Sequence, residues 1–140
     1  MGSARVLIAY GSRAGATADI AAALVDVLRA EGIDPVVADT RDVRDISRYG
    51  AVVIVSGTSV ARWRREAIKF LGRFSDELSR RAVWMVQSGS AGLPPKVKVL
   101  ADKARIRQTT TFGATGLAVD GIRAWASQLG HELTSHVKAA

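Results

Sequence analysis

Cysteine is absent from the 140 residues of this chain. Its absence excludes disulfide bonds, thiolate metal sites and thiol catalysis, and is typical of a reducing compartment. No apolar stretch approaches the length that spans a membrane, and no signal peptide is visible at the N-terminus. We therefore expect a cytoplasmic protein that folds as one domain over residues 1–140.

Acidic residues are too few to balance the basic ones. The chain has 20 Lys and Arg against 13 Asp and Glu, which gives a net charge of +7. Such a balance fits nucleic acid, an anionic membrane surface, an acidic partner or simply a solvated basic surface. The basic residues are spread along the whole chain, without a basic run that contains interleaved aromatics, and this pattern disfavours nucleic acid.

Motifs for nucleophilic catalysis and metal binding are also missing. The chain has no G-x-S-x-G elbow for a serine nucleophile. His131 and His136 are five residues apart, a spacing that does not align two ligands on a helix, and no carboxylate–histidine cluster accompanies them. We therefore expect no metal site and no catalytic side chain that acts without a cofactor.

Strand and helix patterns alternate along the chain. Strands are predicted at 5–10, 35–39, 51–56, 82–88 and 108–113. Helices are predicted at 17–30, 62–79 and 121–137, with shorter ones at 42–48 and 96–104. This alternation predicts an α/β domain, a doubly wound parallel sheet of five strands in the order 2-1-3-4-5 with helices on both faces.

Apolar periodicity gives the helices their buried faces. In the segment 62–79 one face carries Trp63, Ala67, Phe70, Leu71, Phe74 and Leu78. Four basic residues, Arg64, Arg65, Lys69 and Arg73, fall largely outside that face. We expect Trp84 and Trp125 in the core, whereas Trp63 fits either the core or a flat ligand. Gly32 suits the end of the first helix, and Asp120 a cap of the last.

The loop after the first strand has the composition of a phosphate-binding turn. It runs Gly11-Ser12-Arg13-Ala14-Gly15-Ala16-Thr17 into a helix, whose amide groups and dipole favour an anion. It lacks the Lys of a Walker A loop and the three glycines of a dinucleotide fingerprint. Hydroxyls and amides alone suit one terminal phosphate, and the alternative is an ordinary capped turn.

Two further loops share this composition. Residues 56–63 follow the third strand and residues 88–93 follow the fourth, and both are rich in Gly and hydroxyl side chains. The second strand ends differently, in the charged run Asp39-Thr40-Arg41-Asp42. In the order 2-1-3-4-5 the loops after strands 1, 3 and 4 meet in one crevice. Together they predict a phosphate at the first loop and a planar ring between the other two.

With these three segments the chain resembles the flavodoxin family, over nearly its whole length. The resemblance is nearest to the group of menaquinone-dependent protoporphyrinogen IX dehydrogenases, and implies a flavodoxin-like fold with FMN as cofactor. By this resemblance the phosphate would be held by Ser12, Arg13, Ala14, Gly15, Ala16 and Thr17. The ring would lie between Thr58, Ser59 and Trp63 on one side and Ser88, Gly89 and Gly92 on the other.

The sequence departs from the family pattern at a few places. The phosphate loop resembles T-x-T-G-x-T, but Ala14 replaces the middle hydroxyl residue. A hydrogen bond to a charged group is worth roughly 1.5–3 kcal/mol, so FMN binding is weakened by this loss and need not be abolished. The third loop has no aromatic residue, the insertion of long-chain flavodoxins is absent, and so is the long basic segment of bacterial protoporphyrinogen enzymes.

These observations lead to an FMN-binding redox protein that transfers electrons or hydride through bound FMN, with either a redox partner protein or a quinone or other small-molecule substrate as its partner. The positive charge, including Arg62 beside the second loop, predicts a raised flavin potential, which favours a quinone-linked dehydrogenase. One alternative is a low-potential electron-transfer flavodoxin. Another is a flavin-free interaction module that uses its basic surface.

Overall fold

A computed structural model describes residues 5–10, 16–59, 62–63, 65–88, 95–106, 108–112 and 123–132. The strands in these residues are β1 (Arg5–Tyr10), β2 (Asp34–Asp39), β3 (Ala51–Ser59), β4 (Arg62–Trp63), β5 (Ala82–Ser88) and β6 (Gln108–Phe112). The helices are α1 (Ala16–Ala30), the 3₁₀ turn η1 (Thr40–Asp42), α2 (Arg65–Arg73), α3 (Ser75–Leu78) and α4 (Pro95–Lys103), and residues 123–132 are also helical.

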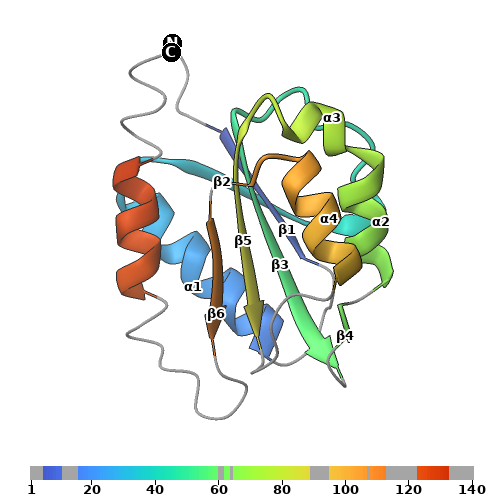
Figure 1. Ribbon diagram of the computed structural model, residues 1–140. Helices are drawn as coiled ribbons and strands as arrows, with labels where there is room; N and C mark the ends of the chain where they lie inside the picture. The colour runs from blue at the N-terminus through green and yellow to red at the C-terminus, as the bar shows by residue number, and fades with distance from the viewer. Residues whose placement is uncertain are drawn as a thin grey trace.

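The strands form one sheet in which the order is β2-β1-β3-β5-β6, with β4 attached to β3 (Figure 1). Each pair in that order is parallel, whereas β3 and β4 are antiparallel. The prediction of an α/β fold with a parallel sheet is confirmed. The prediction of five strands omitted β4, so the sheet in the described part of the chain has six.

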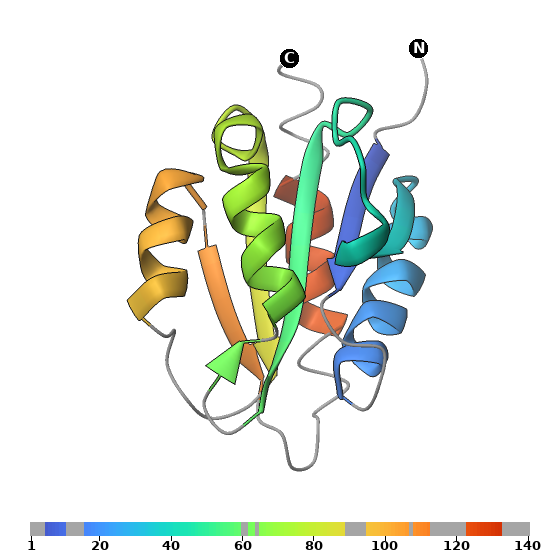
Figure 2. The same cartoon turned by 90° about the vertical axis from the view of Figure 1, so that its right-hand side faces the viewer.

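Helices cover both faces of the sheet (Figure 2). The alternating side chains of β3 explain why, because Val53 and Val55 pack on the side of α1 while Val52 and Ile54 pack on the side of α2. The helix at 123–132 joins α1 on the first face, and α4 joins α2 on the second. The predicted core position of Trp84 is confirmed, since only 1% of its surface is exposed.

Gly32 ends α1 as the sequence predicts. Its φ is +81°, a left-handed conformation that glycine adopts without a steric penalty. The Gly32 amide donates to the carbonyl of Arg29 at 3.1 Å, and the Ile33 amide donates to that of Leu28 at 3.0 Å. This pair of bonds is the Schellman motif, which satisfies the last carbonyls of the helix.

Replacing Gly32 by alanine is therefore expected to destabilise the protein by about 1 kcal/mol, because a Cβ disfavours the left-handed conformation. No atom lies within 4 Å of the Cβ that would be added at Gly32 or at Gly50, so steric overlap is not the cause at either site. Gly50→Ala is the matched control. Urea unfolding of the two variants checks the prediction, and an equal loss of stability in both would contradict it.

The predicted helix over 62–79 is wrong at its start and in its continuity. Residues 62–63 form β4, which pairs with the end of β3, and α2 begins only at Arg65. Trp63 is therefore not part of the helical face. The helix is interrupted at Phe74, whose φ of −106° and ψ of 15° leave the helical region, although the buried side chains of Phe74 and Leu78 continue the apolar face.

The predicted helix over 42–48 is not formed either. The turn η1 occupies Thr40–Asp42, and the extended conformation of Val43 ends it. Beyond it the carboxylate of Asp45 accepts from the Ser47 amide at 3.0 Å and from the Ser47 hydroxyl at 2.7 Å. These bonds lower the pKa of Asp45 and close a local turn that competes with a helix.

The remaining boundaries differ by a few residues. β2 begins one residue before the predicted strand, and β3 runs to Ser59 instead of residue 56. Asp120 and the ends of the predicted helix 121–137 lie outside the described residues, as does residue 113. Trp125 is partly buried against the core. Within the described part of the chain, no helix combines the length and the apolar character needed to cross a membrane.

Candidate functional site

The carboxyl ends of the parallel strands meet at one edge of the sheet. Tyr10 at the end of β1 pairs with Asp39 at the end of β2 on one side and with Val55 of β3 on the other. Farther along the edge, Gly57 of β3 pairs with Ser88 of β5. In a doubly wound sheet this edge carries the ligand crevice, and the expected loops begin here.

The first turn of α1 lies at this same edge. The helix follows β1 and starts with Ala16 and Thr17, two of the residues predicted to hold the phosphate. Figure 2 shows this end of α1 on the same side of the molecule as the carboxyl end of β3. A helix of 15 residues presents unpaired amide groups and a partial positive charge at this end. The geometry therefore suits an anion at the edge of the sheet.

A short hairpin projects from the end of β3. Thr58 pairs with Trp63 and Ser59 pairs with Arg62, so β4 folds back along the last residues of β3. This pairing brings together three predicted site residues, Thr58, Ser59 and Trp63, which the sequence analysis had divided between a loop and a helix. The backbone of the hairpin continues β3 past the end of the neighbouring strand β5 (Figure 1).

The other side of the crevice is less completely described. Ser88 is the last residue of β5 and lies between Gly57 and Phe112 in the sheet. The remaining predicted residues lie outside the described part of the chain, and they are Ser12, Arg13, Ala14, Gly15, Gly89 and Gly92. The structure therefore places β1 and β5, from which these two loops start. The roles of the six residues in cofactor binding stay a prediction.

The end of β2 holds an ion pair beside this edge, in which the carboxylate of Asp39 is buried and the side chain of Arg41 is half exposed. The carboxylate of Asp39 is only 4% exposed. It accepts from the Arg41 backbone amide at 2.9 Å, from Nε at 3.2 Å and from Nη2 at 3.0 Å. Such a bidentate contact compensates a buried carboxylate and fixes the guanidinium in one orientation. The first turn after β2 is thus rigidly organised.

One feature of this region is not predicted by the sequence patterns. The charged segment Asp39-Thr40-Arg41-Asp42 was set apart from the three loops, but in the structure it borders a pocket shared with α2. The basic residues of α2 that line it, Lys69 and Arg73, were predicted only to fall largely outside the apolar face of a helix. Their spacing of four residues was the available signal, because it puts two cations on one side of a helix.

Comparison with known proteins gives a family match. A family of proteins described as a flavodoxin domain matches residues 7–116, a range that contains the three glycine- and hydroxyl-rich segments. A search of curated proteins gives no match.

Solved structures share the fold at low sequence identity. The flavodiiron protein from Giardia intestinalis superposes with a TM-score of 0.75 and 17% identity, over 96% of this chain but only 37% of its own length. A flavodoxin from Pseudomonas aeruginosa gives 0.69 and 14%, over 93% of this chain and 99% of its own. The flavodoxin from Megasphaera elsdenii gives 0.67 and 14%, over 88% and 98%.

Proposed function

Because this chain belongs to the flavodoxin family of domains, we propose that it binds FMN at the carboxyl edge of its sheet and transfers electrons or hydride through that cofactor. One observation carries the proposal. The N-terminus of α1, the β3–β4 hairpin and the end of β5 lie together along that edge, where the three predicted loops start.

The chemistry of the donor groups fits FMN. The amides of the first turn of α1 and the hydroxyls of Ser12 and Thr17 are donors suited to a phosphate. The loop at 11–17 contains no lysine that could take this role. The backbone of the hairpin and of the end of β5 would supply amides and carbonyls for the polar edge of a flat ring. Gly57, which pairs with Ser88, has no side chain, so none projects from this position of the edge between the hairpin and β5.

Bound FMN would supply the redox chemistry, because its ring accepts and gives electrons or hydride. The chain's own residues would bind the phosphate, orient the ring and set the local charge. A net charge of +7 favours the more negative, reduced form of the cofactor. This charge supports a quinone-linked dehydrogenase over a low-potential carrier as the finer assignment.

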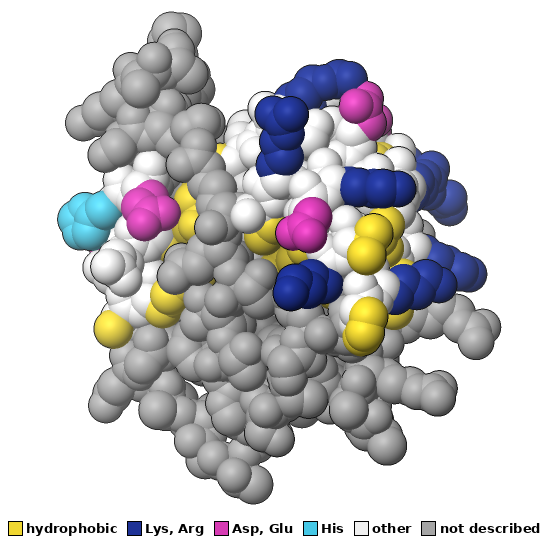
Figure 3. Space-filling view, in the orientation of Figure 1, with side chains coloured by type: hydrophobic (Ala, Val, Ile, Leu, Met, Phe, Trp, Pro, Cys, Tyr) yellow, Lys and Arg dark blue, Asp and Glu magenta, His cyan; other side chains and the backbone are white. Residues whose placement is uncertain are grey.

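The same charge supports an acidic partner or an anionic surface. Figure 3 shows Lys and Arg side chains gathered over the part of the visible face that α3 and α4 form. Three exposed lysines of α4, Lys96, Lys98 and Lys103, belong to this region. Charges of this kind steer association and are screened by salt. An acidic redox protein is therefore the partner that the charge distribution favours.

The test of FMN binding is direct. We expect the purified protein to show a flavin absorbance spectrum, or its apo form to take up FMN stoichiometrically in a titration followed by flavin fluorescence. A colourless protein that does not bind FMN would reject the redox function. It would leave the alternative of an interaction module that uses its basic surface.

Arg62→Ala is expected to lower the midpoint potential of bound FMN. Arg62 lies on β4 opposite Ser59, beside the proposed ring, so its loss removes attraction for the reduced flavin. A loss of about 1 kcal/mol corresponds to a decrease of about 20 mV in a two-electron midpoint potential. Potentiometry of the FMN-loaded protein checks this value.

Arg29→Ala is the matched control for that measurement. Arg29 is exposed in the last turn of α1, at the opposite end of the helix from the proposed phosphate site. Equal midpoint shifts in the two variants would show that net charge matters and that the position of Arg62 does not. No shift in either variant would reject the electrostatic argument.

A further inference from the structure

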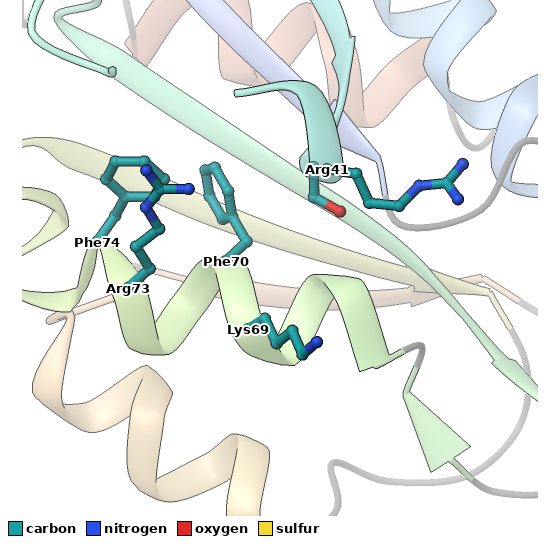
Figure 4. Close-up of a pocket in the computed structure, with 6 residues that line it drawn as sticks. Arg41, Lys69, Phe70, Arg73 and Phe74 are labelled. Carbon is teal, nitrogen blue, oxygen red and sulfur yellow. The ribbon is translucent and has the colours of Figure 1, made fainter. Parts of the chain in front are cut away.

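A pocket of about 340 Å³ lies between the turn η1 and the helix α2 (Figure 4). It is lined by Thr40, Arg41, Lys69, Phe70, Arg73 and Phe74. Its volume falls near the lower end of the range of small-molecule sites. None of these lining residues is acidic, although the turn belongs to a segment with two aspartates. The pocket therefore combines positive charge with an apolar aromatic wall.

The buried hydroxyl of Thr40 is evidence that the pocket binds a ligand. Thr40 is only 6% exposed, and its Oγ1 is buried with no hydrogen-bond partner in the part of the chain that the structure describes. Burying a hydroxyl without a partner destabilises a folded protein. Thr40 is also a lining residue of the pocket, so a rotation of its side chain would bring this buried hydroxyl to a polar ligand atom placed there, which would give it the partner that the described residues do not.

The cations of the pocket differ in what they can do. Arg41 is held by the buried carboxylate of Asp39, and Figure 4 shows its guanidinium turned away from Phe70 and Phe74. Lys69 and Arg73 are exposed and lie one helical turn apart on α2. Figure 4 shows the two side chains extending in opposite directions, so an anion bound by both requires Lys69 to turn toward Arg73. Binding of an anion would offset the repulsion between two like charges at this spacing. These two side chains are the ones that can contact an anionic group.

The aromatic wall is already ordered. The ring centroids of Phe70 and Phe74 are 5.0 Å apart with an angle of 52° between the rings. The guanidinium carbon of Arg73 lies 5.2 Å from the centroid of Phe74, so a cation–π contact holds this side chain over the ring. A site whose walls are fixed beforehand loses less entropy when a ligand binds.

We propose that this pocket binds a small organic anion, a flat apolar body of one or two rings that carries a carboxylate or a phosphate. The anionic group would be bound by Lys69 and Arg73, the hydroxyl of Thr40 would bond to a polar atom of the ligand, and the apolar body would lie against the two phenylalanine rings. This site lies on the α2 face of the sheet, whereas the proposed FMN site lies at the carboxyl edge of the strands β1, β3 and β5.

The test is a titration of the ¹⁵N-labelled protein, saturated with FMN where it binds FMN, with 1-naphthoate and 1-naphthyl phosphate. We expect saturable shifts of the backbone amides of Thr40–Asp42 and of residues 69–74. The neutral 1-naphthalenemethanol should bind at least about tenfold more weakly, because it lacks the charge. Tighter binding of the phosphate would identify a phosphate ligand, and tighter binding of 1-naphthoate a carboxylate.

Variants separate a built site from general attraction. The double variant Lys69→Gln with Arg73→Gln should weaken binding of both anions by about tenfold or more. Thr40→Val keeps the shape of the side chain, and is expected to fold while it also weakens binding. Lys98→Gln with Lys103→Gln removes the same charge from exposed positions on α4, and should leave the affinity nearly unchanged.

Several results would overturn the proposal. The first is the absence of saturable shifts with either anion. The second is an affinity for the neutral alcohol equal to that for the anions. The third is a loss of affinity in the α4 double variant as large as that in the Lys69 and Arg73 double variant. Displacement of 1-naphthoate by stoichiometric FMN would do the same, since FMN itself would then occupy the pocket. None of these results depends on whether the protein acts as a redox carrier.

Discussion

Replacing Ala14 by threonine is expected to tighten FMN binding by about 10- to 100-fold. Ala14 occupies the middle hydroxyl position of the T-x-T-G-x-T pattern that the phosphate loop resembles. A restored hydroxyl would donate to the phosphate, and a hydrogen bond to a charged group contributes roughly 1.5–3 kcal/mol. Fluorescence titration of the apo protein measures the change. The reverse experiment is Thr17→Val, which should weaken FMN binding by a similar factor.

Two controls identify the cause of the effect. Ala14→Val adds a branched side chain of similar shape without a hydroxyl, so it should leave FMN affinity unchanged or lower it. Riboflavin lacks the phosphate, and its affinity should not respond to Ala14→Thr or to Thr17→Val. If Ala14→Thr tightened riboflavin as much as FMN, the loop would not be contacting the phosphate, and the proposed orientation of the cofactor would be wrong.

The largest expected effect on stability is that of Trp84→Ala, which should cost about 3–5 kcal/mol. Trp84 lies in the middle of β5, between Val53 of β3 and Gln108 of β6, and only 1% of its surface is exposed. It belongs to the core cluster under α1 and the helix at 123–132. Removing the indole opens a cavity that strands paired on both sides cannot close. Since domains of this size are stable by about 5–15 kcal/mol, the variant should be near its unfolding threshold.

Urea unfolding followed by far-ultraviolet circular dichroism measures this loss, because fluorescence would change with the tryptophan itself. Val99→Ala is the control, since Val99 is 56% exposed on α4 and alanine is the better helix former. Its stability should be unchanged or slightly higher. A loss below about 1 kcal/mol for Trp84→Ala would mean that the packing around β5 rearranges to fill the space.

The fold could be predicted from the sequence because its signals are local. The continuous apolar run of β3 predicts a strand covered on both faces, and Val52 and Val53 pack into opposite cores. Gly32 marks the end of α1 through its positive φ. The alternation of strands with helices then implies a parallel sheet, whose carboxyl ends meet at one edge.

For the candidate site, the sequence predicted which loops follow which strands, and it did not predict the conformation of those loops. Thr58 and Ser59 were predicted in the loop after the third strand, whereas β3 extends through both, and Trp63 was predicted on a helix but lies in β4. A two-residue strand carries no periodicity, and β4 exists because its backbone pairs with the extended end of β3. Such pairing competes directly with the first turn of a helix. The apolar periodicity of residues 62–79 favoured the helix, because a pattern within one segment contains no information about pairing with another strand.

The sequence by itself determined the class of the fold, the five parallel strands, most of the helices, and the composition of the loops at the carboxyl edge of the sheet. These depend on side-chain patterns within short segments. Only the tertiary structure decided that Thr40 is buried, that Asp39 holds Arg41, and that α2 and η1 enclose a pocket. The physical reason is that burial depends on which segments pack together. In the sequence, residues 39–42 are only a charged run at the end of a strand, and their burial follows from the helix α2 beside them.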